Sequence, residues 1–222
     1  MAKKVDTSFK LLRSRRKTAT EEALLKVFRR MQNDAAARRD GGVRKVVSAK
    51  AQRDLADAIL AENMLTAAEV AERVADTFGD DEYDPEIMRG WLAANSDAVA
   101  DSIAGSIEDD ITAAGDSDDD EISGDPVGHV FGILASSGAA GYAQQMVTTS
   151  AGFGARDAAG SAGAGIKQWV VNSGNPRTSH AAMDGETVRL DENFSNGLAW
   201  PGDPQGDADE NAGCMCSLTL IY

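Results

Sequence analysis

The chain has 222 residues, of which 42% are hydrophobic and 5% aromatic, and a formal net charge of −14. This length predicts one or two domains with a real hydrophobic core. No apolar run approaches the roughly 20 residues of a membrane span, and the first residues lack a signal-type apolar region, so we expect no membrane partner and synthesis in a cytoplasm.

The charge is divided unevenly along the chain. Residues 1–60 hold 16 Lys and Arg against 7 Asp and Glu, a balance of +9, whereas residues 61–222 hold 6 against 29, a balance of −23. The basic segment fits either an anionic partner such as DNA or internal pairing with the acidic body. Lys167 is the only lysine after Lys50. Such an acidic, lysine-poor composition is typical of proteins that work in concentrated salt and indicates a halophilic host, although a GC-rich genome would cause part of the same bias.

Residues 1–45 are predicted to form a basic helical arm. Thr18 and Glu21 form a capping-box pattern that starts a helix, and Gly41-Gly42 ends it. The candidate partner-binding residues of this arm are Arg13, Arg15, Arg16, Lys17, Arg29 and Arg30.

Residues 46–114 are predicted to be a helical region. One helix begins near Ser48, and a second capping box, Thr66 to Glu69, suggests another start. Asp84-Pro85 combines an N-cap acceptor with a proline at the first helical position, and a long helix should follow it. Residues 115–125 are an acidic linker, too poor in apolar groups to pack.

Residues 126–222 form the predicted C-terminal domain. Asp125-Pro126 repeats the helix-start signal, and Ala/Gly-rich helices follow to about residue 163. Glycine weakens helices, so this segment is either broken or held by tight packing. Asp184-Gly185 predicts a short hairpin, and Leu218–Ile221 a terminal strand. The fold class is therefore mainly α, with a small C-terminal α+β module of about 55–60 residues, a size at which stability needs a metal, a partner or packing on other helices.

The only two cysteines form a Cys-x-Cys pair, Cys214 and Cys216. In an extended chain their sulfurs project to the same side, and His180 offers a third ligand for zinc. The fourth ligand would be Asp184, Asp203 or Glu210. The alternative is that both thiols are ordinary buried side chains. A disulfide between residues this close in sequence is sterically poor.

His180 also allows a catalytic interpretation. With Ser179 and Asp184 it has the residue types of a hydrolase, and with Arg177 those of a nuclease. Neighbours in sequence rarely converge as a catalytic set, so we expect no catalytic residue. Instead, Arg177 is expected to pair with Asp184 while His180 bonds across the hairpin.

The C-terminal residues follow a recognisable order: Trp169, Arg177, His180, Asp184, Gly185, Val188, Phe194, Pro201, Glu210, Asn211, Cys214 and Cys216. This pattern resembles the Mu F-like minor head proteins, the head-morphogenesis family of tailed viruses. The resemblance covers about residues 127–220. The chain departs from it at Gly213 and Met215, where the family usually has Asn and Arg, and at Met146–Ser150, where it usually has an Arg-Thr-Glu run.

The resemblance implies a minor capsid protein that assists head assembly or genome delivery. It would associate with the portal protein and the major capsid protein, and with packaged DNA in some cases, in several copies per head. The implied location is the virion, at the portal vertex or capsid interior, after assembly in the host cytoplasm. It implies no enzyme. The alternatives are a metal-dependent hydrolase or nuclease that uses His180, and a DNA-binding accessory protein that acts through its basic arm.

Overall fold

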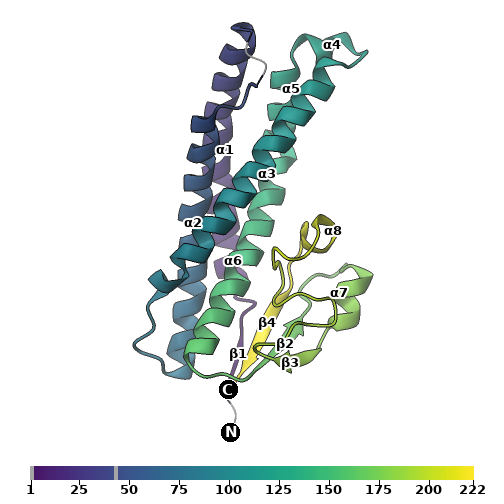
Figure 1. Cartoon of the computed structure of the whole chain (residues 1–222). Coiled ribbons are helices and arrows are strands. Elements are labelled where there is room, and N and C mark those ends of the chain that lie inside the picture. Colours follow the sequence, from purple (N-terminus) through teal and green to yellow (C-terminus); the bar gives the residue numbers. More distant parts are fainter. Residues whose placement is uncertain (1–2, 43–44) are drawn as a thin grey trace.

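Long helices dominate the computed structural model, which describes residues 3–42 and 45–222. They run side by side as an elongated bundle, and a small sheet lies against one end of it (Figure 1). The long helices are α1 (Lys10–Asp40), α2 (Ala49–Phe78), α3 (Arg89–Gly115) and α6 (Ala139–Ser161). The predicted fold class, mainly α with a small C-terminal sheet, is confirmed. No helix in the described ranges is both long and apolar enough to cross a membrane.

Three predicted helix starts are confirmed by their capping bonds. The side chain of Ser48 accepts a hydrogen bond from the amide of Ala51 and begins α2. Asp84 caps the short helix η1 (Pro85–Met88), which continues into α3. Asp125 caps α5 (Pro126–Ile133). In each case an oxygen at the N-cap satisfies an amide that lacks a partner within the helix.

Both capping-box predictions are wrong, because Thr18 and Thr66 lie inside helices. Helix α1 begins eight residues before Thr18, at Lys10. Thr66 is buried, and its hydroxyl accepts a hydrogen bond from Arg16 of α1 at 3.2 Å. The hydroxyl therefore links two helices instead of capping one.

The Ala/Gly-rich segment forms an almost continuous helical path. Helix α5 passes through a π-helical turn, η2 (Leu134–Gly138), into α6. A Cβ atom at Gly154 would lie 2.4 Å from the carbonyl oxygen of Ala67 in α2, and one at Gly152 would lie 2.5 Å from the ring of Trp200. These glycines let α2 and the C-terminal loop approach the backbone of α6. Tight packing, with a local π turn, therefore accommodates the glycines.

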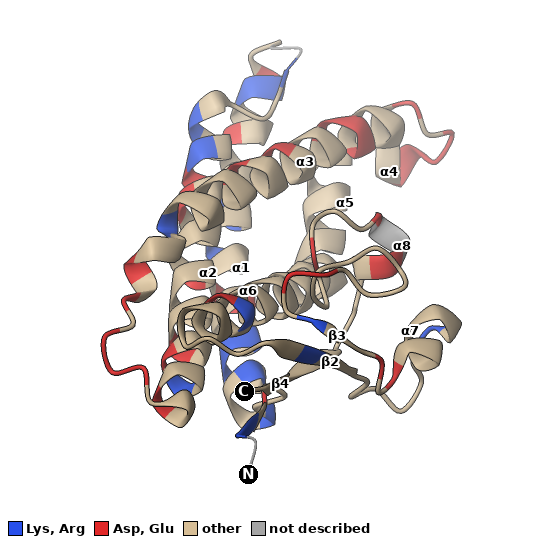
Figure 2. Cartoon of the chain, turned by 60° about the horizontal axis from the view of Figure 1, so that its bottom comes forward, with Lys and Arg blue, Asp and Glu red and all other residues tan. Residues whose placement is uncertain are grey.

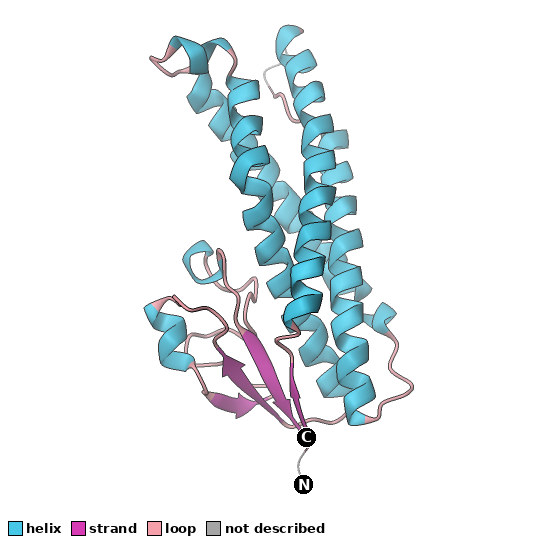
Figure 3. Ribbon diagram, turned by 180° about the vertical axis from the view of Figure 1, so that it is seen from behind, coloured by secondary structure: helices cyan, strands magenta, loops and turns pink. Residues whose placement is uncertain are grey.

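The sheet joins the two ends of the chain. Its strands are β1 (Lys4–Asp6), β2 (Ile166–Val170), β3 (Thr187–Arg189) and β4 (Ser217–Ile221), in the order β1-β4-β2-β3 with antiparallel neighbours (Figure 3). The predicted terminal strand is confirmed, and it is central: Leu220 faces Val5 on one side and Lys167 on the other. Because β1 completes this sheet, the N-terminal segment is part of the C-terminal module.

The described residues 3–42 are consequently not a separate arm. Helix α1 packs on α2 and α6, and Arg15 and Arg16 pair with Glu69 and Glu62 of α2. Basic residues gather on α1, whereas acidic residues follow α3 and the loops (Figure 2). Of the six candidate partner-binding residues, Arg29 and Arg30 are exposed, Lys17 is half-buried, and Arg13 directs its guanidinium inward.

The predicted hairpin around Asp184-Gly185 is wrong. Residues Thr178–Met183 form the short helix α7. Strand β3, which follows this helix in the chain, pairs with β2, which precedes it. Gly185 has a positive φ of 84° and donates its amide to the carbonyl of Trp169. The Asp-Gly turn therefore connects a helix to a strand, because the long-range pairing with β2 outweighs the local hairpin signal.

The acidic segment 115–125 contains the short helix α4 (Asp120–Gly124), capped by Asp119. Its residues bury no side chain. The prediction that this stretch does not pack agrees with the exposure of most of its residues, but it is partly helical and Ile122 packs, half-buried, against the bundle core.

Lys167, the lone lysine of the acidic part, is fully buried in β2. Its Nζ donates to the carbonyl oxygens of Leu190 at 3.0 Å and Ala199 at 2.7 Å and lies over the ring of Phe194. Burial lowers the pKa of Lys167 to about 8, so the ammonium is mostly charged at neutral pH. It fastens the loop after β3 to the sheet.

We expect Lys167→Met to destabilise the protein by about 1–3 kcal/mol, because two carbonyl groups under the loop lose a charged donor. Urea unfolding followed by circular dichroism measures this. The matched control is Lys50→Met, at an exposed lysine that pairs only with Asp54, where we expect a change within about 0.5 kcal/mol. Equal effects of the two substitutions would contradict the role given to Lys167.

Two glycines of α6 test the close packing of α2 on α6. Gly154→Ala should destabilise by about 1–3 kcal/mol, because its methyl group would meet the backbone of Ala67. Gly141→Ala meets nothing within 4 Å and should stabilise by up to about 1 kcal/mol through helix propensity. For a chain of this size, each kcal/mol moves the melting temperature by about 2–4 °C. Shifts of the same sign would contradict this packing argument.

Candidate metal centre

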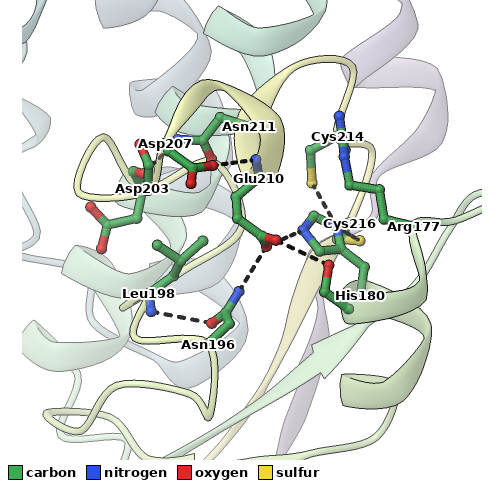
Figure 4. Close-up of polar contacts among 12 residues, drawn as sticks. Arg177, His180, Asn196, Leu198, Asp203, Asp207, Glu210, Asn211, Cys214 and Cys216 are labelled. Atoms are coloured by element: carbon green, nitrogen blue, oxygen red, sulfur yellow. Dashed lines mark hydrogen bonds and ion pairs between the residues drawn. The ribbon is translucent and has the colours of Figure 1, made fainter.

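Three of the sequence-predicted ligands meet between α7 and the start of β4 (Figure 4). His180 lies on α7, and Cys214 and Cys216 lie on the chain that enters β4. The Nδ1 atom of His180 is 3.7 Å from the sulfur of Cys214 and 3.5 Å from that of Cys216. All three residues are 2% exposed, and both thiols are free. The structure therefore brings together the predicted His-Cys-Cys set.

The backbone around the cysteines is held by contacts with two long helices, α6 and α1. Gly213 has a positive φ of 67° just before the pair. The carbonyl of Cys214 accepts a hydrogen bond from the hydroxyl of Thr148 in α6 at 2.6 Å. The carbonyl of Cys216 accepts one from Nη1 of Arg13 in α1 at 3.2 Å. Both sulfurs are therefore positioned by contacts with long helices.

Glu210 orients the histidine ring from its other edge. Its Oε2 lies 3.0 Å from Nε2 of His180, and its Oε1 accepts from the hydroxyl of Ser179 at 3.0 Å. Asn196 donates to the same carboxylate at 3.4 Å. A carboxylate on the far nitrogen of a histidine fixes its orientation and tautomer, as in many metal centres.

None of the three candidates for a fourth ligand joins the cluster. Glu210 contacts the far nitrogen of His180. Asp184 accepts from the amide of Val171, and Asp203 accepts from the amides of Ala199 and Gln205. Asp203 lies in a separate loop, away from the sulfurs (Figure 4). The described residues thus supply three ligands, with Glu210 as a supporting group.

The expected pair of Arg177 and Asp184 does not form. Arg177 instead donates to the carbonyl of Ala212, while Asp184 holds the amide after β2. Both side chains therefore fix backbone near the cluster. Their separation follows from α7, which replaces the hairpin that would have placed them opposite one another.

The cluster couples three ionisable groups. The pKa of His180 is raised, chiefly by its hydrogen bond with Cys214 and also by Glu210. The pKa of Cys214 is lowered, with its hydrogen bond to Cys216 as the largest cause, and the pKa of Cys216 is raised by the same contact and by burial. The two sulfurs therefore behave as a pair that shares one proton near neutral pH.

Two neighbours of the centre were not predicted. Trp169 of β2 packs edge-on against the rings of His180, at 5.3 Å, and Phe194, at 5.1 Å. Arg13 reaches the centre from α1, and its charge acts on both cysteines. Its sequence position, far from the cysteines in a basic run, carries no signal for this contact, because only the folded chain brings residues 13 and 216 together.

No family model, curated protein or solved structure matches this chain. The resemblance to Mu F-like proteins therefore rests on the residue pattern alone.

We expect the reduced, metal-free protein to carry one thiolate per chain at neutral pH, because the pKa of Cys214 is lowered and that of Cys216 raised. Ultraviolet thiolate absorbance, measured while the pH is lowered, checks this. Cys216→Ala should raise the pKa of the Cys214 thiol, because it removes the hydrogen bond that lowers this pKa most. Two neutral thiols in the folded wild-type protein at pH 7 would contradict the prediction.

Proposed function

We propose that this chain is a Mu F-like minor head protein of a tailed virus, a structural component that assists head assembly or genome delivery. One observation carries the proposal: five residues of the resemblance, Trp169, His180, Glu210, Cys214 and Cys216, meet at one buried centre. His180 contacts both cysteines, Trp169 and Glu210. The pattern therefore corresponds to one structural unit of the folded chain, and this supports the resemblance.

The environment of His180 supports a structural role over the hydrolase alternative. Its Nδ1 faces the two sulfurs, its Nε2 faces Glu210, and its side chain is buried. A general base needs a ring nitrogen within reach of substrate. A groove of about 510 Å³ lies beside Arg156, Leu190 and Asp191, and its lining does not include the histidine or either cysteine.

The surface of α1 suggests where a partner would dock. Arg29 and Arg30 are exposed on this helix, while much of the remaining chain is acidic. We propose that this basic stretch faces the portal protein, the capsid lining or packaged DNA. The acidic composition supports a halophilic host, where apolar contacts would have to supplement charge because molar salt largely screens exposed charges more than about 3 Å apart.

The test is to purify heads of the virus that carries this gene and to measure the chain by quantitative mass spectrometry after crosslinking. We expect the chain in intact heads, at fewer copies than the major capsid protein, with crosslinks from α1 to the portal or capsid protein. The double variant Arg29→Glu/Arg30→Glu should reduce incorporation.

Arg189→Glu is the matched control, because Arg189 is exposed but lies on β3 and pairs with Asp191. It should leave incorporation unchanged. Heads that lack the chain would overturn the proposal. Strand cleavage abolished by His180→Ala would favour the hydrolase or nuclease. Steeply salt-dependent DNA binding by a chain absent from heads would favour the accessory protein.

A further inference from the structure

We propose that His180, Cys214 and Cys216 bind a soft divalent cation such as zinc, and that Arg13 and Trp169 stabilise the metal-bound sulfurs. The ion would then fasten the first helix to the last strand. This inference rests on the geometry of the centre and does not require the viral function.

The spacing of the ligand atoms fits a tetrahedral ion. Zinc binds thiolate sulfur at about 2.3 Å and imidazole nitrogen at about 2.0 Å, so tetrahedral angles place sulfur and nitrogen about 3.5 Å apart. The observed separations from Nδ1 of His180 are 3.5 Å to Cys216 and 3.7 Å to Cys214. The three ligand atoms all lie within 4.8 Å of one another. One ion can therefore reach all of them with little movement of the side chains.

Buried donors without partners belong to two residues that contact the ligand residues. Among the described residues, the indole N–H of Trp169 and the Nε and Nη2 atoms of Arg13 are buried and have no hydrogen-bond partner. The ring of Trp169 packs against that of His180 at 5.3 Å, and Nη1 of Arg13 donates to the carbonyl of Cys216 at 3.2 Å. Unpaired buried donors cost stability unless an acceptor is supplied. Metal-bound thiolates are such acceptors, and they remain ionised while the metal is bound.

The charges of the centre balance when a divalent ion is present. Two thiolates neutralise the ion, and Arg13, which donates to the carbonyl of Cys216, and Glu210, which contacts His180, add one charge of each sign. Glu210 holds Nε2 of His180 at 3.0 Å, which leaves Nδ1 free to ligate. Sulfur and imidazole ligands select soft or borderline ions such as zinc over magnesium or calcium.

The fourth ligand would come from outside this set. Asp184 and Asp203 accept hydrogen bonds from backbone amides elsewhere, and the surroundings are buried. A small ligand such as water fits these conditions. The ion would hold together α7, β4 and, through Arg13, helix α1.

The experiment titrates the reduced, metal-free full chain with Co²⁺ and then displaces the Co²⁺ with Zn²⁺. We expect one equivalent of Co²⁺ with the visible and thiolate-to-metal absorption of a tetrahedral site. Cys214→Ser should lose that spectrum. Arg13→Met should weaken Zn²⁺ binding about 10–100-fold, the usual effect of removing a group that supports metal ligands. Arg13→Lys should restore part of the affinity because it keeps the charge.

Arg15→Met is the matched control, since Arg15 lies on the same helix but pairs with Glu69 at the surface. It should bind Zn²⁺ like the wild type. Circular dichroism establishes that each variant is folded, and Arg13→Lys tests the charge if Arg13→Met does not fold. A folded wild type without the tetrahedral Co²⁺ spectrum would overturn the site. If folded Arg13→Met or folded Arg13→Lys binds Zn²⁺ as tightly as the wild type, the role of Arg13 is overturned.

The two proposals fail separately. A chain that enters virus heads but binds no metal overturns only the metal site. A chain that binds metal as described but is absent from heads overturns only the proposed function.

Discussion

The close packing of small residues along α6 is the constraint on which the rest of the structure depends. Gly154 lets the backbone of α2 approach, and Gly152 receives the ring of Trp200 from the C-terminal loop. Helix α6 therefore contributes to the bundle core and to the core under the sheet. A larger side chain at Gly154 would push α2 away from α6, and one at Gly152 would displace the C-terminal loop. The other contacts between these elements would then be lost.

The candidate metal centre depends on this packing. Thr148 of α6 holds the carbonyl of Cys214, and Arg13 of α1 holds that of Cys216. The cysteines are thus positioned from the bundle, and His180 from the module itself. A module of this size buries a small core. Its support comes from strand β1 beside β4, from Lys167 under the loop, and from the helices behind the sheet.

The basic residues of the N-terminal segment fall into two groups, those that pair within the fold and those that stay exposed. The basic N-terminal segment is largely integrated into the fold, because Arg15 and Arg16 pair with glutamates of α2 and Arg13 points toward the cysteines. What remains for a partner is the exposed part of α1 around Arg29 and Arg30. Sequence charge alone overstated the basic surface, since several of these charges pair with other groups of the same chain. The proposed docking surface is accordingly smaller than the basic segment.

The sequence by itself determined the features that local chemistry controls. Side-chain oxygens at Ser48, Asp84 and Asp125 start helices because they satisfy nearby amides. The residue types of His180, Cys214 and Cys216 identified a possible ligand set, because few other side chains bind soft metals. Tertiary structure alone decided what depends on distant neighbours. Thr66 became a link between helices, the Asp184-Gly185 turn joined a helix to a strand, and Arg13 reached the cysteines, because each of these outcomes requires contacts between segments far apart in the chain.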